Sequence, residues 1–227
     1  MTTNKHQKVS VVIRAKNEER WVGHCIQSVL EQINSPEIIL VNNQSSDRTI
    51  EIARAFQRDP DLESLGSYTD VKIIDIDNYS PGSALNLGVS NSSNENILVI
   101  SSHCVLTKLN LNKHLKDLES YKAIFGNQIP IYDGKKIKKR YIWSHFSDKE
   151  EENKYSEMED RYFFHNALSF FKKETLVKFP FDEHLVGKED RYWAKNMIEK
   201  DYKILYDPTM EVKHYYTDAG NTWKGIG

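Results

Sequence analysis

The chain has 227 residues, of which 39% are hydrophobic and 28% are charged, a composition typical of one large soluble globular domain. The formal net charge is −2, which gives no electrostatic reason to expect a nucleic-acid partner. No apolar stretch approaches the roughly 20 residues that cross a bilayer, and the opening MTTNKHQKV lacks the apolar core of a signal peptide. A cytoplasmic protein is therefore expected, with Cys25 and Cys104 as reduced, buried thiols.

The first half of the chain alternates predicted strands and helices. Short apolar runs predict strands over residues 9–13, 37–41, 71–76 and 97–100. Helical spacing and capping residues predict helices over residues 18–32, 49–56 and 81–90. Strands separated by helices imply right-handed crossovers, so an α/β fold with a mainly parallel central sheet flanked by helices is expected.

The second half loses this alternation. A basic run over residues 135–140 (KKIKKR) is followed by an acidic stretch over residues 148–160, which suggests a solvated charged insert near 133–160. The alternative is a basic patch for a phosphate-bearing acceptor or an anionic membrane surface. An ordered segment over residues 162–171, a helix over 188–200 and short strands near Ile204 and Val212 are predicted to follow.

Polar loops follow three of the predicted strands. They read RAKNE from Arg14, NNQSSD from Asn42 and SSH from Ser101. The carboxyl ends of parallel strands meet at one edge of a sheet, where α/β proteins bind their ligands. Neither common glycine-rich phosphate-binding motif is present, so side chains and strand-end backbone must hold the ligand.

Four segments together resemble the family-2 glycosyltransferases. They are VSVVIRAKNEERWVGHCIQSVLEQ, IILVNNQSSDRTIEIA, SPGSALNLGV and FDEHLVGKEDRYWAKNMIEKDYKILYDPTMEVKHYY, in the order of the family. The resemblance implies a single Rossmann-related GT-A domain over residues 1–227. Residues 1–106 would form the nucleotide-sugar-binding half and residues 107–227 the acceptor-binding half. The implied activity is inverting transfer of a sugar from a nucleotide sugar to a saccharide or lipid-linked acceptor in polysaccharide or glycoconjugate synthesis.

The resemblance also implies a donor site, with one departure. Its expected residues are Ala15, Asn17, Glu18, Asn43, Ser45, Pro81, Ser101, Ser102 and His103. The family places an Asp-x-Asp motif where this chain has Ser101-Ser102-His103, and an Asp-Asp pair where it has Asn42-Asn43. The hard oxygen ligands that hold a divalent ion against a diphosphate are therefore missing.

This departure leaves the cofactor and the nucleotide open. His103 and His214 are candidate ligands for a divalent ion, Mn²⁺ or Mg²⁺; alternatively, a protonated His103 meets the phosphate directly, or His103 is only a hydrogen-bonded strand-end residue. The amide of Asn43 is able to accept from N3 of uracil or thymine, or to donate to N3 of cytosine. UDP-, dTDP-, GDP- and CMP-sugars all remain candidate donors.

An acidic pair marks the predicted catalytic base. Glu189 and Asp190 open the last predicted helix, where the helix dipole stabilises negative charge. The resemblance implies that Asp190 is the base that deprotonates the acceptor hydroxyl, while Glu189 shapes the pocket. The implied acceptor-binding residues are His165, Asn166, Lys188, Arg191 and Trp193.

Two other functions compete with glycosyl transfer. A catalytically decayed sugar- or nucleotide-binding protein would explain the lost aspartates, although a decayed site has no need of Glu189 and Asp190. A sugar nucleotidyltransferase shares the architecture, but the first loop lacks the glycine-rich stretch that cradles a triphosphate. A peripheral position at the inner face of a membrane is the alternative to a purely cytoplasmic location.

Overall fold

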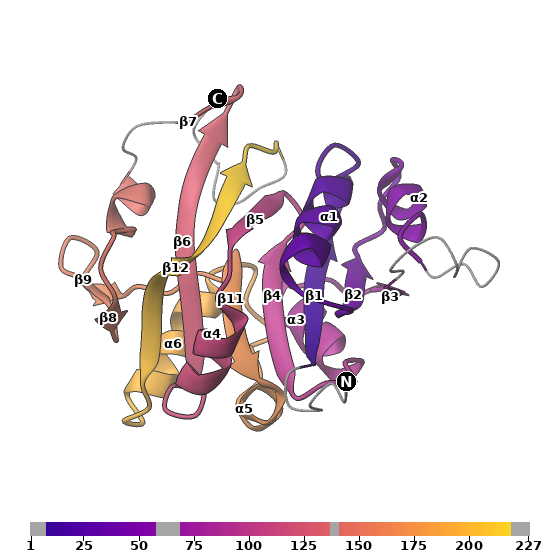
Figure 1. Cartoon of the computed structure of the whole chain (residues 1–227). Coiled ribbons are helices and arrows are strands. Elements are labelled where there is room, and N and C mark those ends of the chain that lie inside the picture. The colour runs from indigo at the N-terminus through magenta and orange to yellow at the C-terminus, as the bar shows by residue number, and fades with distance from the viewer. Residues whose placement is uncertain (1–7, 58–68, 137–140, 219–227) are drawn as a thin grey trace.

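A computed structural model describes residues 8–57, 69–136 and 141–218. Within them one large sheet has the strand order β3-β2-β1-β4-β11-β6-β12-β5 (Figure 1). Its strands are β1 (Val9–Ala15), β2 (Glu37–Asn42), β3 (Asp70–Asp75), β4 (Asn96–Ser101), β5 (Cys104–Lys108), β6 (Ala123–Tyr132), β11 (Leu168–Lys172) and β12 (Ile204–Tyr215). The short strands β7 (Lys135–Lys136) and β8 (Glu151–Glu152) pair with β6 and β12, and β9 (Tyr155–Ser156) pairs with β10 (Arg161–Tyr162).

The first four strands form the parallel half of the sheet. β1 pairs with β2 and β4, and β2 pairs with β3, all in parallel register. Nearly every residue of β1, β2 and β4 is buried, as expected of strands covered on both faces. The predicted strands and the alternating topology are confirmed here, each with its bounds within one or two residues of the prediction.

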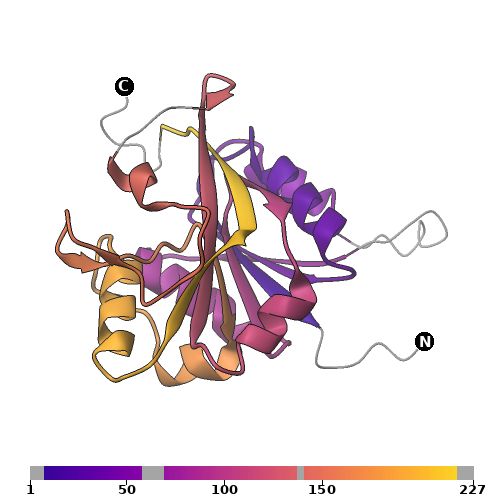
Figure 2. The same ribbon diagram turned by 60° about the vertical axis from the view of Figure 1, so that its left-hand side comes forward.

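The second half of the sheet is mixed. β11 is antiparallel to both β4 and β6, whereas β6 and β12 run parallel over most of their length (Figure 2). A register shift between Asp207 and Glu211 interrupts β12, which is one long strand in place of the two short strands predicted near Ile204 and Val212. This half therefore adds antiparallel strands to a sheet whose first half is parallel.

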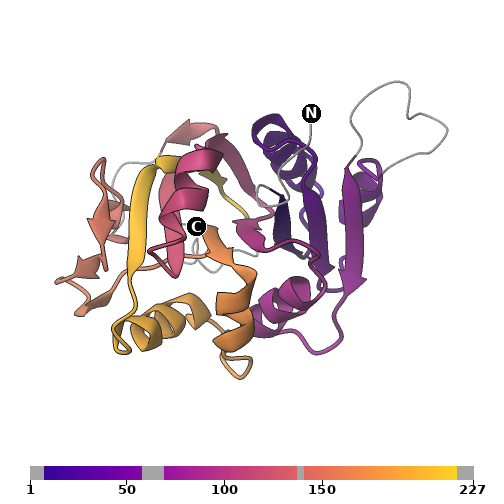
Figure 3. The same ribbon diagram turned by 60° about the horizontal axis from the view of Figure 1, so that its bottom comes forward.

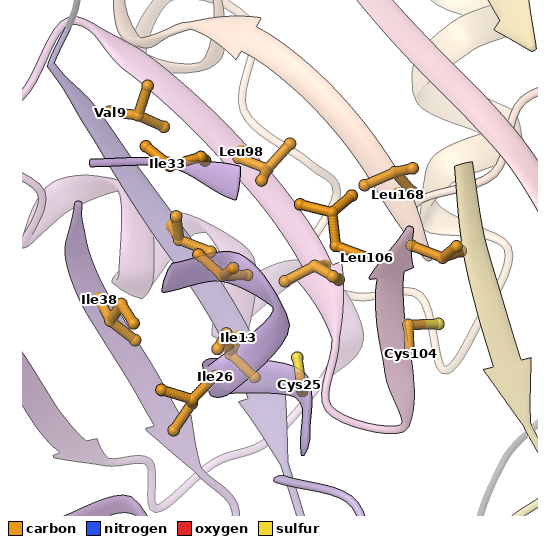
Figure 4. Packing of buried hydrophobic residues seen from close by; sticks show 14 of the residues in the cluster. Val9, Ile13, Cys25, Ile26, Ile33, Ile38, Leu98, Cys104, Leu106 and Leu168 are labelled. Carbon is orange, nitrogen blue, oxygen red and sulfur yellow. The ribbon is translucent and has the colours of Figure 1, made fainter. Parts of the chain in front are cut away.

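Helices cover both faces of the sheet (Figure 3). One face packs against α1 (Val22–Gln32), α2 (Thr49–Arg54) and α4 (Leu111–Asp117), through the cluster that includes Ile13, Ile26, Ile38 and Leu98 (Figure 4). The other face packs against α3 (Pro81–Ser90), α5 (Lys173–Lys178) and α6 (Glu189–Ile198). Cys25 and Cys104 are buried free thiols in the first cluster, as predicted.

Some predicted boundaries were wrong for local reasons. The helix expected from residue 18 begins at Val22, because the Glu18 carbonyl accepts from Trp21 and Val22 in a tight turn that precedes the helix. The ordered segment expected over residues 162–171 is divided between β10 and β11. The strands β5 and β6 and the helices α4 and α5 were not predicted.

The charged insert is described only in part. Of the basic run 135–140, residues 137–140 lie outside the described residues, so neither of its two expected roles is tested. The acidic stretch contributes β8 and β9, and the 3-10 helix η3 (Tyr141–His145) precedes it. In the described parts of the chain, no helix is long and apolar enough to cross a membrane.

Candidate active site

Hydrogen bonds join the loop after β1 to the loop after β2 at the carboxyl edge of the parallel sheet. The backbone N–H of Asn17 donates to Ser45 Oγ at 3.0 Å, and Ser46 N–H donates to Asn17 Oδ1 at 2.8 Å. Asn17 and Gln44 both have left-handed backbone conformations, with φ near 53° and 51°. Such strain in non-glycine residues persists where surrounding contacts impose it, and it is concentrated at functional sites.

The second loop has one bound and one open asparagine. Asn42 Nδ2 donates to Asp75 Oδ1 at 2.6 Å, and Asn42 Oδ1 accepts from Ser45 N–H at 3.0 Å. Asn43 donates through its backbone to the Ala15 carbonyl at 2.9 Å, and its half-exposed side chain forms no hydrogen bond with the described residues. Asn42 is therefore a loop-shaping residue, whereas the amide of Asn43 is available to a ligand.

A buried ion pair holds the first turn of α6 at the same edge of the sheet. Arg14, near the end of β1, bonds Glu189 Oε1 at 2.9 Å and the carbonyl of Pro81 at 3.0 Å. The two charged side chains are 19% and 7% exposed. Burial alone would lower the pKa of Arg14, but the Glu189 carboxylate raises it overall, so the guanidinium stays charged. Three segments distant in sequence meet at this single side chain.

Asp190 follows directly in the first turn of α6. Its carboxylate accepts from the backbone N–H of Arg191 at 2.8 Å and of Asn166 at 3.3 Å. Burial raises its pKa above the usual aspartate value, in opposition to these hydrogen bonds and to the charges of Arg191 and Arg14. Lys188 precedes the helix in a left-handed conformation, φ 66°, and its side chain is exposed. A half-buried carboxylate with a raised pKa is a suitable proton acceptor.

Five side chains connect the loop after β1, through the turn after β4, to the segment before β11. His103 Nδ1 lies 2.9 Å from Glu18 Oε1, and His103 Nε2 lies 3.0 Å from His214 Nε2. His214 Nδ1 lies 2.8 Å from Gln128 Oε1, and Gln128 Nε2 lies 3.0 Å from His165 Nδ1. We call these five residues, Glu18, His103, His214, Gln128 and His165, the histidine chain. It runs from the predicted donor residues to the predicted acceptor residues.

Burial keeps two of these imidazoles neutral. It lowers the pKa of His214 well below the ordinary histidine value, assisted by the neighbouring His103 and His165. Burial, with the positive charges of Arg191 and Arg161, lowers the pKa of His165 to about 3. Neutral imidazoles have one N–H and one lone pair, so their hydrogen bonds have a definite direction.

The residues at the Asp-x-Asp position do not fit a hard divalent ion. In the described residues no three histidine, cysteine or acidic side chains are grouped so that they could hold one metal ion. Glu18 Oε1 lies against His103 Nδ1 and His214 Nε2 lies against His103 Nε2, so both ring nitrogens of His103 already have partners. Mg²⁺ prefers oxygen ligands and does not suit these residues, and the two-histidine metal site stays a prediction.

Most of the predicted site residues converge on this edge. The donor-side residues Ala15, Asn17, Glu18, Asn43, Ser45, Ser101, Ser102 and His103 lie in the three strand-end loops, with Ala15 and Ser102 themselves buried. On the acceptor side, Asn166 lies beside Asp190, and its Nδ2 is buried without a hydrogen-bond partner in the described structure. Arg191 is half-buried, with a guanidinium nitrogen 4.0 Å from Glu159.

Trp193 was predicted to bind the acceptor, and this prediction is wrong because the side chain lies in the core. Its side chain is only 4% exposed, and its indole N–H donates to the carbonyl of Phe179 at 2.7 Å. Its ring packs against Phe164, Phe171 and Phe181 in the core beneath α6. A side chain so placed has no face to offer an acceptor, because it fills the space between α6 and the sheet.

Sequence reasoning missed Arg14 and Gln128. Arg14 stands in a loop that was singled out, but nothing in the sequence indicated that its partner is 175 residues away. Gln128 lies in β6, whose sequence AIFGNQIPIY interrupts its apolar residues with glycine and proline and so was not recognised as a strand. The two residues connect the segments of the site to one another.

A parallel half-sheet with polar loops at its strand ends, extended by a mixed second half that supplies a carboxylate pair, is the GT-A type of fold. The model of the family described as Glycosyl transferase family 2 matches residues 10–185, and the chain belongs to this family.

Curated relatives are similar to part of the chain in sequence, and solved structures are similar to it in fold. Two 4,4'-diaponeurosporenoate glycosyltransferases of Staphylococcus aureus, from strains bovine RF122 / ET3-1 and USA300, are 33% identical over 51 residues, which is 22% of this chain and 14% of theirs. The crystal structure of S. aureus TarS 1-349 in complex with UDP-GlcNAc has a TM-score of 0.66 at 16% identity, covering 96% of this chain and 61% of that one. The crystal structure of S. aureus TarS 1-349 in complex with UDP has a TM-score of 0.65 at 18% identity, and the match covers 92% of this chain and 60% of that one. The chain thus spans about three-fifths of these solved structures and a small part of the curated relatives.

Proposed function

We propose that the chain is an inverting glycosyltransferase of polysaccharide or glycoconjugate synthesis, which transfers a sugar from a nucleotide sugar to a saccharide or lipid-linked acceptor. One observation carries the proposal. The Arg14–Glu189 ion pair holds the first turn of α6, and with it Asp190, at the strand ends where the donor loops meet. An inverting transfer needs one carboxylate there, to take the proton of the acceptor hydroxyl as its oxygen attacks the anomeric carbon.

The proposed donor is a UDP-sugar. The open amide of Asn43 supports a pyrimidine base, since its carbonyl is able to accept the N3–H of uracil. The complexes of TarS with UDP and with UDP-GlcNAc favour uridine among the pyrimidines. A dTDP-sugar presents the same N3–H and is the next candidate, ahead of GDP- and CMP-sugars.

His103 is the proposed contact to the donor phosphate. It stands where the family has the second aspartate of Asp-x-Asp, and its side chain is 13% exposed, so it is accessible from the donor side. An imidazolium would supply a positive charge to the diphosphate as it leaves. The two-histidine site for Mn²⁺ is the alternative, because nitrogen ligands suit a borderline ion better than Mg²⁺.

A donor panel tests the proposal. Hydrolysis and transfer would be measured with UDP-, dTDP-, GDP- and CMP-sugars, each with EDTA, Mg²⁺ or Mn²⁺. We expect turnover of a UDP-sugar, with the anomeric configuration of the product inverted by NMR, and no loss in EDTA. Activity that EDTA removes and Mn²⁺ restores better than Mg²⁺ would favour the two-histidine metal site. Binding of nucleotide sugars without turnover would overturn the proposed enzymatic function and would support the alternative of a sugar-nucleotide-binding protein.

A further inference from the structure

Gln128 occupies the middle of the histidine chain. It lies on β6, is only 3% exposed, and uses both ends of its amide, one toward His214 and the other toward His165. His214 comes from β12, and His165 precedes β11, so this amide connects three strands. It belongs to none of the four segments that carry the family resemblance.

A backbone amide decides which way the Gln128 side chain points. The N–H of Ala167 donates to His165 Nδ1 at 3.3 Å, so Nδ1 is the lone-pair nitrogen of that ring. The end of Gln128 that faces Nδ1 must then donate, which makes it the NH₂ group. The opposite orientation would place the Gln128 oxygen against a lone pair and leave Ala167 facing an N–H. His165 therefore has its proton on Nε2, which donates to none of the described residues.

The orientation of the Gln128 amide also determines the protonated nitrogens of His214 and His103 on the donor side of the histidine chain. The Gln128 oxygen faces His214 Nδ1, so Nδ1 carries the proton, and in this buried ring Nε2 then has the lone pair. His103 Nε2 must then donate to His214 across 3.0 Å, while His103 Nδ1 donates to the Glu18 carboxylate. The side-chain amide of Gln128 thus determines which atom donates in each hydrogen bond of the histidine chain.

We propose that Gln128 is a positioning residue for both substrates of the transferase. On the donor side it keeps the Nε2 lone pair of His214 directed at His103, which fixes the ring that faces the donor phosphate. On the acceptor side it keeps the Nε2–H of His165 free to donate to a hydroxyl beside Asp190. The part that concerns the substrates rests on the proposed function; the tautomers do not.

The first experiment reads the tautomers directly in the free protein. Imidazole ¹⁵N spectra distinguish a protonated ring nitrogen from a lone-pair nitrogen, and they would be recorded for the wild type, Gln128→Glu and Gln128→Leu. We expect Nδ1 of His165 unprotonated and Nδ1 of His214 protonated in the wild type. Gln128→Glu, of the same shape, presents only acceptors and should move the His165 proton to Nδ1 while leaving His214 unchanged. Gln128→Leu should release the His214 ring, whereas the Ala167 N–H should still hold Nδ1 of His165 as an acceptor.

The second experiment measures turnover of the nucleotide sugar identified by the donor panel. Partners that orient a functional imidazole typically matter by about 10–100-fold, so both variants should lose activity in that range. Gln32→Glu, the same change on the exposed end of α1, is the matched control and should leave spectra and activity unchanged. Thermal unfolding checks that each variant is folded.

The outcomes separate this inference from the proposed function. A wild-type His165 protonated on Nδ1, or a wild-type His214 unprotonated on Nδ1, would overturn the proposed orientation. Altered tautomers together with wild-type turnover would limit Gln128 to a structural role and overturn it as a positioning residue. A protein that turns over no nucleotide sugar would overturn the proposed function, yet the tautomer measurement would still decide the direction of the chain.

Discussion

Asp190 combines features that a general base requires. Two backbone amides orient its carboxylate, while burial raises its pKa and so strengthens it as a proton acceptor. Only the ionised form accepts a proton. The base-competent form is therefore lost as the pH falls through this raised pKa, and kcat/KM should decline on the acidic side at a pH above the ordinary carboxyl range.

Replacing the base tests this role. Asp190→Asn should lower kcat by about 10²–10⁴-fold and leave nucleotide binding nearly unchanged, because the amide keeps the shape but accepts no proton. Steady-state kinetics and calorimetry on UDP measure the two effects. Asp201→Asn, at the exposed end of the same helix region, is the control. Wild-type kcat in Asp190→Asn would assign the base to another residue.

His103 should matter for the donor alone. Both ring nitrogens of His103 are bonded to Glu18 and His214, so the imidazolium would act on the diphosphate through its charge, and His103→Ala should weaken UDP binding roughly 10-fold. His24→Ala removes an exposed imidazole from α1 and should bind UDP like the wild type. Titration calorimetry in EDTA measures both. Strong Mg²⁺-specific activation that persists undiminished in His103→Ala would contradict both a phosphate contact and a two-histidine metal site.

At the scale of elements, the Arg14–Glu189 pair joins β1 to α6. Removing one member leaves an unpaired buried charge, so Arg14→Met should destabilise the fold by about 3 kcal/mol and displace Asp190. The double variant Arg14→Met/Glu189→Met should recover most of this stability, because neither charge remains, but it should not recover activity. Urea unfolding and turnover measure the two effects separately.

An exposed pair serves as the matched control for this cycle. Arg48 and Glu51 are also 2.9 Å apart, but their side chains are 69% and 64% exposed. Solvent screens such pairs, so Arg48→Met should leave the free energy of unfolding close to that of the wild type. Equal losses in Arg14→Met and Arg48→Met would show that the buried pair does not hold α6 in place.

At the scale of the whole molecule, Glu37 fastens the edge of the sheet opposite the site. Its carboxylate accepts from Ser10 Oγ at 2.5 Å, from Lys72 Nζ at 2.6 Å and from Ser93 N–H at 2.7 Å. Burial alone would raise its pKa, but these hydrogen bonds lower it to about 2. The unfolded chain binds the proton more tightly. Glu37 therefore contributes stability above the ordinary glutamate pKa near 4.5, and this is lost as the pH falls toward 2.

Replacing Glu37 should make the free energy of unfolding depend less steeply on pH in the acid range. Glu37→Gln should lower the free energy of unfolding at pH 7 by on the order of 3 kcal/mol and by much less near pH 2, since the protonated wild type has already lost the difference. Urea unfolding at several pH values measures this. Glu119→Gln, on an exposed turn, should leave the profile unchanged. A constant difference between wild type and Glu37→Gln across the range would disprove the assignment.

The sequence determined the parallel half of the sheet and the position of the donor loops. Its strands are short apolar runs and its helices have capping residues, so local patterns suffice there. The mixed half was predicted less well, because β6 contains glycine and proline and β12 has a register shift, and both are stabilised by strands remote in sequence. Asp190 was predicted as the base from the family resemblance together with its place at a helix start, whereas the burial of Trp193 depends on how α6 packs on the sheet.

Only the tertiary structure decided how the parts of the site meet. The sequence places Arg14, His103, Gln128, His165 and Glu189 far apart, and no local pattern states that Arg14 pairs with Glu189 or that one amide orients two histidines. Hydrogen bonds and ion pairs depend on distances of about 3 Å between atoms, and long-range packing sets those distances. The chain's own residues thus determine which groups are available for the chemistry, and the fold determines the direction in which each one donates or accepts.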